Sequence, residues 1–338
     1  MRFQNAFTIR APSLPTLVMT PDALATLQQH LLTALSSVPD ETRRLFHGRG
    51  RVWAGLEHIT VDWMQGVVLV SLFKEPLETE LQALTRQLQE LTHTAQWQQS
   101  LAHTLLLQHR YLPQSSVQWL LGEVTDEWVI TENDLRYKID FGKKQNSGLF
   151  LDMRYGREWV RSQAKGKRIL NLFAYTCGFS VAAIAGGADH VVNLDMAKAA
   201  LNRGRENHRL NGHDLSRVSF LGHDLFKSWA KVTRSGPYDL VIIDPPSFQK
   251  GSFMLDKDYQ RVLRRLPELL TEDGMVLACM NDPAVGTDFL IRHTAVEAPG
   301  LRFEQRLENP PEFPDASLEG GLKALIFKAD GEPRAGWA

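Results

Sequence analysis

The segment RILNLFAYTCGFSVAAIAGGADHVVNLD (residues 168–195) indicates the class of fold. An apolar run ends at Phe173, a turn of small residues reaches Gly178, an apolar helical stretch follows, and a second apolar run ends at Asp195. Parallel strands joined by a helix bring the turn and Asp195 to one sheet edge, where a carboxylate can accept hydrogen bonds from ribose hydroxyls. The turn lacks GxGxxG, so we predict a site for a nucleoside without phosphates, with an ordinary strand-to-helix connection as the alternative.

The same alternation of apolar strands and helical segments continues to the end of the chain. Helical stretches such as 197–211 and 259–270 separate the short apolar strands, which are 168–175, 190–196, 217–224, 238–244 and 274–280. The segments 301–313 and 322–327 fit a final antiparallel pair. We therefore predict an α/β fold with a Rossmann-like, doubly wound, mostly parallel seven-stranded sheet over residues 146–338.

The first part of the chain has a different pattern. Residues 41–145 combine β runs around Gln65-Gly66, a leucine-spaced helix over 77–91 and a hairpin that turns near Asn133, which predicts a small α+β domain that could bind RNA. Residues 1–40 contain a helix that begins near Pro21, and we predict an N-terminal helical extension.

Composition limits the class of protein. The 338 residues carry 38 basic and 39 acidic side chains, a net charge of −1, which excludes a strongly basic nucleic-acid coat. The chain has no apolar run long enough for a membrane span and no signal peptide, and its two cysteines are typical of a reducing compartment, so a cytoplasmic protein is expected. The eleven histidines lack metal-ligand spacing, and no metal site is predicted.

Two further carboxylates end predicted strands. Asp224 closes FLGHD, where it could meet an adenine amino group, and Asp244 opens DPPSF at the end of the next strand. Pro245 and Pro246 cannot continue a central strand and leave rigid carbonyl acceptors, while Phe248 offers a flat face on which a planar substrate could stack. The alternative is a proline-rich strand end with a core phenylalanine.

These segments together resemble the class I S-adenosylmethionine-dependent methyltransferases. NLFAYTCGF (171–179) looks like their methionine-binding motif, and NLDM (193–196) looks like their ribose-binding motif. GHD (222–224) looks like the adenine-binding motif, and DPPSF (244–248) looks like the catalytic motif. QNSGLFLDMR (145–154) and FPDASLEGGLKALIF (313–327) resemble bacterial 23S rRNA large-subunit base methyltransferases, which form 5-methylcytosine or 7-methylguanine. The resemblance covers about 41–330, and residues 1–40 do not match the PUA domain of the cytosine-modifying relatives.

The resemblance implies the site residues and the cofactor, S-adenosylmethionine. The catalytic set that it implies is Asp244, Pro245, Pro246 and Phe248. The cofactor-binding set that it implies is Asp152, Arg154, Asn171, Phe173, Ala174, Tyr175, Thr176, Gly178, Asp195, Met196, Asp224, Leu225 and Asp244. Arg154 could pair with the cofactor carboxylate or with Asp152.

The acceptor atom depends on whether a thiolate is present, because methylation at cytosine C5 needs one to attack the ring. Relatives with this chemistry carry the cysteine just after the fifth strand, where this sequence has Asn281. Cys279 is interpreted as a core thiol and Cys177 as a packing residue beside the cofactor. Direct transfer to a base nitrogen is therefore preferred.

Basic residues gather in two places, which could hold phosphates or be ordinary solvated charge. One group is Lys143, Lys144, Arg154, Arg157, Arg161, Lys165, Lys167 and Arg168, and the other is Arg43, Arg44, Arg49 and Arg51. We expect a methyltransferase that acts on a base in RNA, and we prefer rRNA as its substrate. A protein side chain or small molecule as the acceptor, and a non-catalytic cofactor- or RNA-binding module, are the alternatives, and a homodimer is left open.

Overall fold

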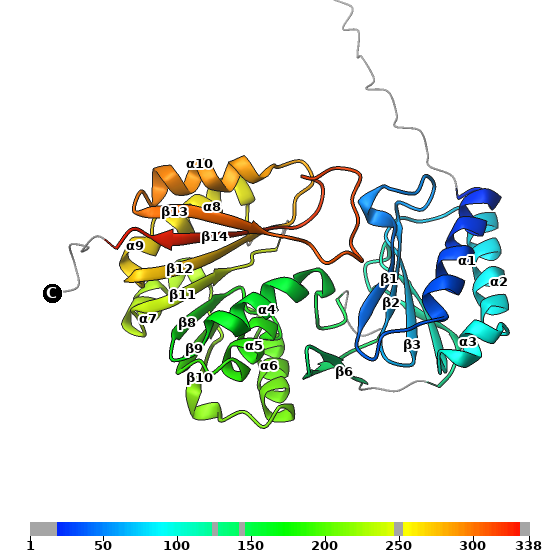
Figure 1. The fold of residues 1–338 in the computed structure, drawn as a ribbon, viewed down its shortest axis with the longest axis horizontal. Coiled ribbons are helices and arrows are strands. Elements are labelled where there is room, and N and C mark those ends of the chain that lie inside the picture. The colour runs from blue at the N-terminus through cyan, green and yellow to red at the C-terminus, as the bar shows by residue number, and fades with distance from the viewer. Residues whose placement is uncertain (1–18, 124–127, 142–145, 247–252, 332–338) are drawn as a thin grey trace, which may run out of the picture.

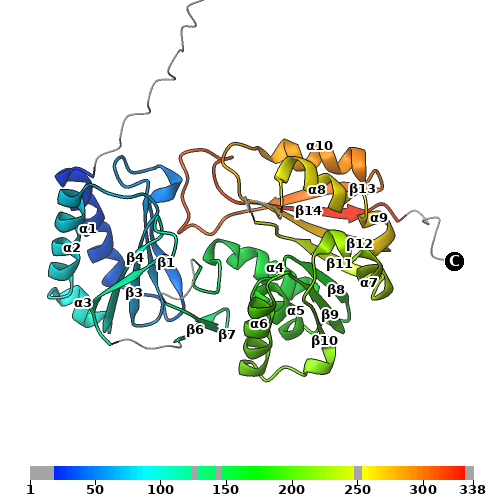
Figure 2. The same ribbon diagram turned by 180° about the vertical axis from the view of Figure 1, so that it is seen from behind.

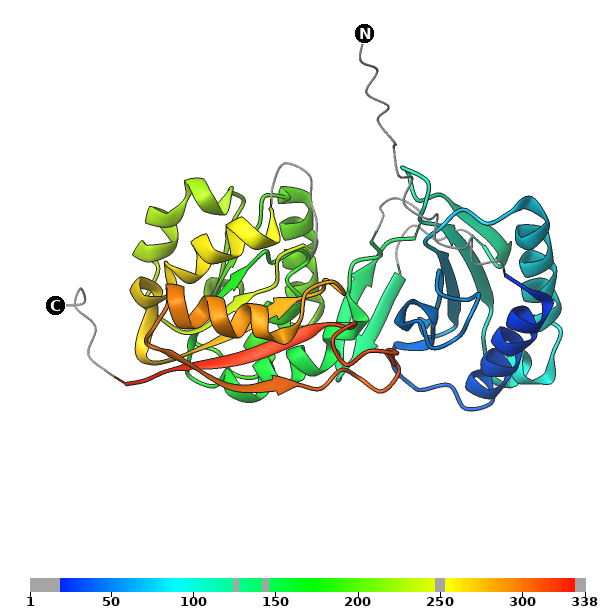
Figure 3. The ribbon, with the colours of Figure 1, turned by 90° about the horizontal axis from the view of Figure 1, so that it is seen from above.

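A computed structural model describes residues 19–123, 128–141, 146–246 and 253–331. Two α/β units lie side by side, the first in blue and cyan and the second in green to red, with a short hairpin between them (Figure 1). The same arrangement is seen from behind in Figure 2 and from above in Figure 3.

The second unit is built on one seven-stranded sheet with the order β10-β9-β8-β11-β12-β14-β13. The strands are β8 (Arg168–Leu172), β9 (His190–Leu194), β10 (Val218–Leu221), β11 (Tyr238–Ile243), β12 (Leu270–Met280), β13 (Leu301–Leu307) and β14 (Lys323–Ala329). The pairs from β10 to β12 are parallel, and β14 is antiparallel to both of its neighbours. The predicted Rossmann-like, mostly parallel sheet with a final antiparallel pair is confirmed.

Helices cover both faces of this sheet, as its apolar strands require. The helices are α4 (Arg154–Gln163), α5 (Gly178–Ala185), α6 (Lys198–Leu210), α7 (Trp229–Arg234), α8 (Leu255–Leu263), α9 (Leu266–Leu269) and α10 (Thr287–Glu297). Val160 and Ala183 bring α4 and α5 against one face, and Val232, Leu263 and Leu290 bring α7, α8 and α10 against the other. Full burial of a valine or leucine side chain stabilises the fold by about 1.5–3 kcal/mol.

The first unit has a five-stranded sheet in the order β1-β2-β3-β4-β5. Its strands are β1 (Arg43–His47), β2 (Ile59–Trp63), β3 (Val67–Leu72), β4 (Thr104–His109) and β5 (Val117–Leu121). The parallel pair β3–β4 is connected by α2 (Glu78–Leu91) and α3 (Ala95–Gln99). Gln65 and Gly66 have positive φ in the turn between β2 and β3, at the predicted place.

The helix α1 (Pro21–Leu35) packs on the same sheet. Thr20 caps its first turn through a hydrogen bond from the Ala23 amide, and Pro21 has the φ that a first helical position needs. Leu27, Leu31 and Leu35 are fully buried in the core that α2 and α3 also enter. The helix of the predicted N-terminal extension, residues 21–35, therefore shares the core of the first unit.

The hairpin β6 (Trp128–Glu132) and β7 (Leu135–Ile139) joins the two units. Asn133 and Asp134 form its turn with φ of 50° and 63°, a two-residue hairpin geometry that these residue types tolerate. Ile130 and Tyr137 pack in one cluster with Leu106 of the first sheet and Val181 of α5. None of the described helices is long and apolar enough to cross a bilayer.

Candidate active site

The carboxyl ends of the parallel strands place the predicted carboxylates at one edge. Leu172 at the end of β8 is paired with Leu194 of β9 and with Ile243 of β11. The next residues along these strands are Phe173, Asp195 and Asp244, so they emerge side by side. The order of the strands reverses between β8 and β11, which is where ligands bind in sheets of this kind.

The loop between β8 and α5 has an unusual backbone. Phe173, Tyr175 and Cys177 have φ of 58°, 47° and 63°, a conformation that costs side-chain-bearing residues about 1–3 kcal/mol each and is concentrated at ligand sites. Asp195 holds this loop, because its carboxylate accepts hydrogen bonds from the Tyr175 amide at 2.8 Å and from the Ala197 amide at 2.7 Å. Thr176 Oγ1 donates to the Gly148 carbonyl at 2.5 Å.

The same edge carries groups that fit a nucleoside. The Asp195 carboxylate follows the end of β9, and the apolar side chain of Met196 beside it is 57% exposed. Asp224 caps the short turn after β10 by accepting a hydrogen bond from the Phe226 amide at 2.9 Å, and the next residue, Leu225, is buried. Asp195, Asp224 and Met196 together suit an adenosine group.

Asn171 does not reach this edge. Its side chain is buried within β8 and donates to Asn193 Oδ1 at 2.9 Å, and Asn193 in turn donates to Ser180. Ala174, Thr176 and Gly178 are in the loop and the first turn of α5, as predicted. The cofactor-binding role of Asn171 has no support from its placement, because its amide is used inside the sheet.

Two carboxyl groups and one amide surround the end of β11. Asn281 donates to Asp152 Oδ2 at 3.3 Å. Loss of water around its carboxylate and the nearby charge of Asp152 raise the pKa of Asp244 to about 7. Burial raises the pKa of Asp152 as well. Pro245 is buried directly after Asp244, Pro246 is partly buried, and Phe248 lies outside the described residues.

A sequence model of the S-adenosylmethionine-dependent methyltransferases matches residues 43–328. The chain belongs to this family. The Bacillus subtilis protein named "Putative ribosomal RNA large subunit methyltransferase YwbD" is 31% identical over 251 residues, which are 72% of this chain and 61% of that protein. Ribosomal RNA large subunit methyltransferase I of Aeromonas salmonicida is 35% identical over 157 residues, 45% of this chain and 40% of that protein. This methyltransferase thus spans 40–61% of these curated relatives.

A solved structure supports the fold. SMU.776, described as a putative methyltransferase complexed with SAH, superimposes with a TM-score of 0.78, covers 90% of this chain and 80% of its own, and is 24% identical. At this identity the similarity establishes the architecture of the methyltransferase. S-adenosylmethionine is the cofactor of the family, and the carboxylates and apolar side chain at the strand ends fit it.

A buried ion pair holds the GLFLDMR segment of the methyltransferase in place. Arg157 of α4 donates to both carboxylate oxygens of Glu132, at 2.6 and 2.8 Å, and to the Phe150 carbonyl at 2.8 Å. Gly148 has φ of 126°, which only glycine adopts without strain. Glu132 could not be identified from the sequence beyond its place near a hairpin turn, because its partner is 25 residues away.

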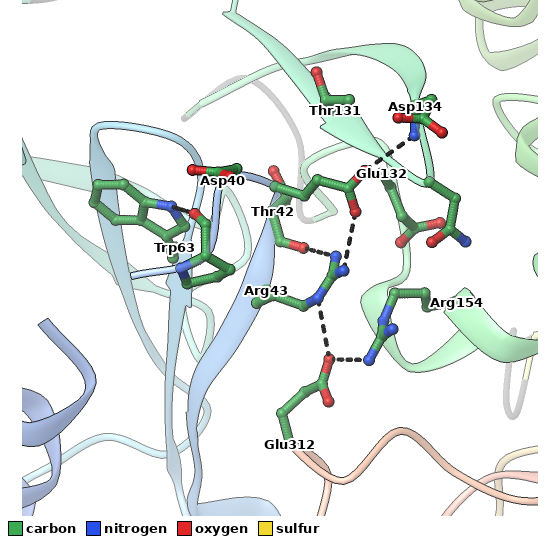
Figure 4. A network of polar contacts seen from close by, with 12 residues as sticks. Asp40, Thr42, Arg43, Trp63, Thr131, Glu132, Asp134, Arg154 and Glu312 are labelled. Atoms are coloured by element: carbon green, nitrogen blue, oxygen red, sulfur yellow. Dashed lines mark hydrogen bonds and ion pairs between the residues drawn. The ribbon is translucent and has the colours of Figure 1, made fainter. Parts of the chain in front are cut away.

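Arg154 has a partner that was not expected. Its Nη2 donates to Glu312 Oε1 at 2.6 Å, and Arg43 Nε of the first unit lies 3.8 Å from the same oxygen (Figure 4). Arg154 therefore takes part in an ion pair that connects α4, β1 and the segment before β14, and its pairing with the cofactor carboxylate stays a prediction. The predicted cofactor role of Arg154 is not supported by this placement.

Four of the eight residues in the first basic group bind other parts of the protein. Arg161 donates to the Asn133 carbonyl, and Arg168 to the Ser235 carbonyl. Together with Arg154 and Arg157, they hold neighbouring segments rather than form a free basic face. Lys143 and Lys144 lie outside the described residues.

Both cysteines of the methyltransferase are buried. Cys279 lies on β12 and is fully buried, and its backbone carbonyl accepts a hydrogen bond from Tyr259 Oη at 3.1 Å. Burial raises the pKa of the Cys279 thiol well above its usual range. Burial raises the pKa of the Cys177 thiol in the same direction. Neither thiol is placed to form a thiolate, in agreement with the core and packing positions predicted for them.

Proposed function

We propose that this methyltransferase transfers the methyl group of S-adenosylmethionine to a nitrogen of a base in large-subunit rRNA. The observation that carries the proposal is the set of groups around the end of β11: Asp152, Asp244 and Asn281 meet there, and each is a hydrogen-bonding group. Amide and carboxyl groups orient the edge of a base and accept its protons, which is the work that transfer to nitrogen requires.

The residues of the chain bind the cofactor and the acceptor base and orient them toward each other. S-adenosylmethionine, when bound, supplies a methyl group on a positively charged sulfur, which is a good electrophile without a metal. Asp195 accepts hydrogen bonds from ribose hydroxyls and fixes the loop from Phe173 to Cys177. Asp244 and the Pro245 carbonyl accept from a donor on the base, and catalysis is mainly positioning of the two reactants.

Transfer to nitrogen keeps the chemistry balanced without a covalent enzyme intermediate. The nitrogen lone pair forms the new bond to the methyl carbon, and the carbon–sulfur bond breaks with its electron pair left on sulfur. An amine acceptor also loses a proton, which the carboxylate of Asp244, directly after β11, can take up. The buried, protonated Cys279 argues against the alternative attack on cytosine C6 that C5 methylation needs.

The choice of rRNA rests on the relatives, which are named as ribosomal RNA large subunit methyltransferases. The net charge of −1 favours a second acceptor class, a protein side chain or a small molecule. The cytoplasmic location and the homodimer stay predictions.

Distribution of label separates these acceptors. The purified protein is incubated with methyl-labelled S-adenosylmethionine and an extract from cells that lack its gene, and RNA, protein and small molecules are then separated. We expect label in the rRNA fraction. Label in protein or small molecules alone would favour the second class, and cofactor binding without turnover would indicate a non-catalytic module.

A further inference from the structure

Three arginines of the first unit gather on the side that faces the candidate active site. Arg44 is in β1, Arg49 is in the short turn Gly48–Gly50 after it, and Arg110 follows β4. The Arg49 and Arg110 guanidinium groups lie 4.2 and 4.7 Å from the centroid of the same ring, that of Phe73. We call Arg44, Arg49 and Arg110 the arginine cluster.

The cluster has more positive charge than its described partners neutralise. Arg44 is paired with Asp62, at 2.5 Å from Nε to Oδ1. Arg110 donates to the neutral Asn146 side chain at 2.6 Å. In the part of the chain that the structure describes, no carboxylate forms an ion pair with Arg49 or Arg110. Burial and the neighbouring arginines lower the pKa of Arg110 to about 10.

The backbone around Arg49 is fixed by close contacts. A β-carbon at Gly48 would lie 1.8 Å from the Leu56 carbonyl oxygen, and one at Gly50 would lie 1.8 Å from the Pro314 carbonyl oxygen. The Gly50 carbonyl also accepts from the Ala316 amide at 2.7 Å. The turn is therefore seated between two segments, and it presents the exposed Arg49 side chain from a defined position.

The arginine cluster lies close to both halves of the candidate site. Arg110 binds Asn146, whose carbonyl accepts from Tyr175 Oη at 3.3 Å, so this arginine borders the cofactor loop. Arg49 is near enough to Asp152 for their charges to interact. An anion on the cluster would thus lie beside the space between the cofactor loop and Asp152.

We propose that the arginine cluster binds the phosphodiester next to the target nucleotide and so holds its base at the end of β11. The inference deepens the proposed function and rests on it. Guanidinium groups match the geometry of phosphate oxygens, and a planar group stacked on an aromatic ring loses less conformational freedom on binding. A phosphate also supplies a direct anionic partner to Arg49 and Arg110, which form no ion pair with a carboxylate among the described residues.

Charge removal tests the inference. Arg49→Ala and Arg110→Ala each remove one phosphate partner, and Arg86→Ala on the exposed side of α2 is the matched control. The probe is an unmethylated transcript of large-subunit rRNA, and its affinity is measured across salt concentrations. We expect about three- to tenfold weaker RNA binding for each cluster variant, a salt slope smaller by about 0.7–0.9, and S-adenosylmethionine affinity within about twofold of the parent.

Other results would overturn the inference in distinguishable ways. Cluster variants that bind RNA as Arg86→Ala does, while the parent still methylates RNA, would remove the phosphate role and leave the proposed function intact. A loss of S-adenosylmethionine affinity as large as the loss for RNA would assign the cluster to the cofactor carboxylate. A parent protein that neither binds nor methylates RNA would overturn both proposals.

Discussion

Arg157 and Glu132 form a bidentate ion pair, with 2.6 Å from Nε to Oε1 and 2.8 Å from Nη2 to Oε2. Their side chains are only 4% and 1% exposed. The pair connects α4 to the hairpin between the two units. We predict that Glu132→Ala destabilises the protein by about 3–5 kcal/mol, because it leaves the Arg157 charge buried without an anionic partner. Urea unfolding of the variant measures this cost.

Two companion variants test the cause of that loss. Glu158→Ala removes an exposed carboxylate from the same helix, and its free energy of unfolding is expected to stay within about 0.5 kcal/mol of the parent. The double variant Glu132→Leu/Arg157→Met removes both charges and should recover most of the stability. A single Glu132→Ala variant as stable as Glu158→Ala would contradict the account of the buried pair.

Asp195→Ala should weaken S-adenosylmethionine binding by about 1–3 kcal/mol, because the carboxylate is the ribose acceptor and also holds the Tyr175 amide. Calorimetric titration gives the affinity directly. Asp189→Ala, at the opposite end of β9, is the control and should bind the cofactor as the parent does. Equal affinities in the two variants would exclude Asp195 from the cofactor site.

Asp244→Asn should lower turnover by a larger factor than it lowers S-adenosylmethionine affinity, because Asp244 meets the acceptor base rather than the adenosine. Steady-state kinetics and cofactor titration on the same preparation separate the two effects. A variant with normal turnover and weak cofactor binding would reverse the assignment of DPPSF.

The pH dependence of stability offers a second test of Asp244. Its native pKa is about 7, whereas an unfolded aspartate titrates near 3.9, so the native state holds a proton that the unfolded state has lost between these values. This contribution to stability is present at low pH and is lost as the pH rises toward 7. The free energy of unfolding of Asp244→Asn, relative to that of the parent, should therefore increase between about pH 4 and 7. A difference between the two proteins that does not change over this pH range would show that Asp244 has an ordinary pKa.

Cys279→Ser should leave turnover largely intact, because the thiol is buried and protonated and therefore cannot act as a nucleophile. A moderate loss of stability is expected from placing a hydroxyl in the core. Turnover that disappears in a variant with a normal circular dichroism spectrum would revive the covalent cytosine mechanism.

Local patterns made the sheet and its edge predictable. The strands around Asp195 and Asp244 are short apolar runs bounded by helical stretches, and each signal lies within about ten residues of chain. The partners of Arg154 and Arg157 could not be read in this way. Glu312 is 158 residues from Arg154, and the sequence alone does not distinguish an arginine that binds a distant carboxylate from one that faces solvent. The core position of α1 was missed for the same reason, since its leucines only show that one face is apolar.

The atom that receives the methyl group tests the central proposal most directly. Unmethylated large-subunit rRNA is incubated with the protein and methyl-labelled S-adenosylmethionine, digested to nucleosides and separated by chromatography with mass detection. We predict that the label is in a nucleoside methylated on a base nitrogen, such as a methylguanosine. Label in 5-methylcytidine would contradict the proposal. RNA that carries no label after an incubation long enough for the reaction to finish would contradict it as well.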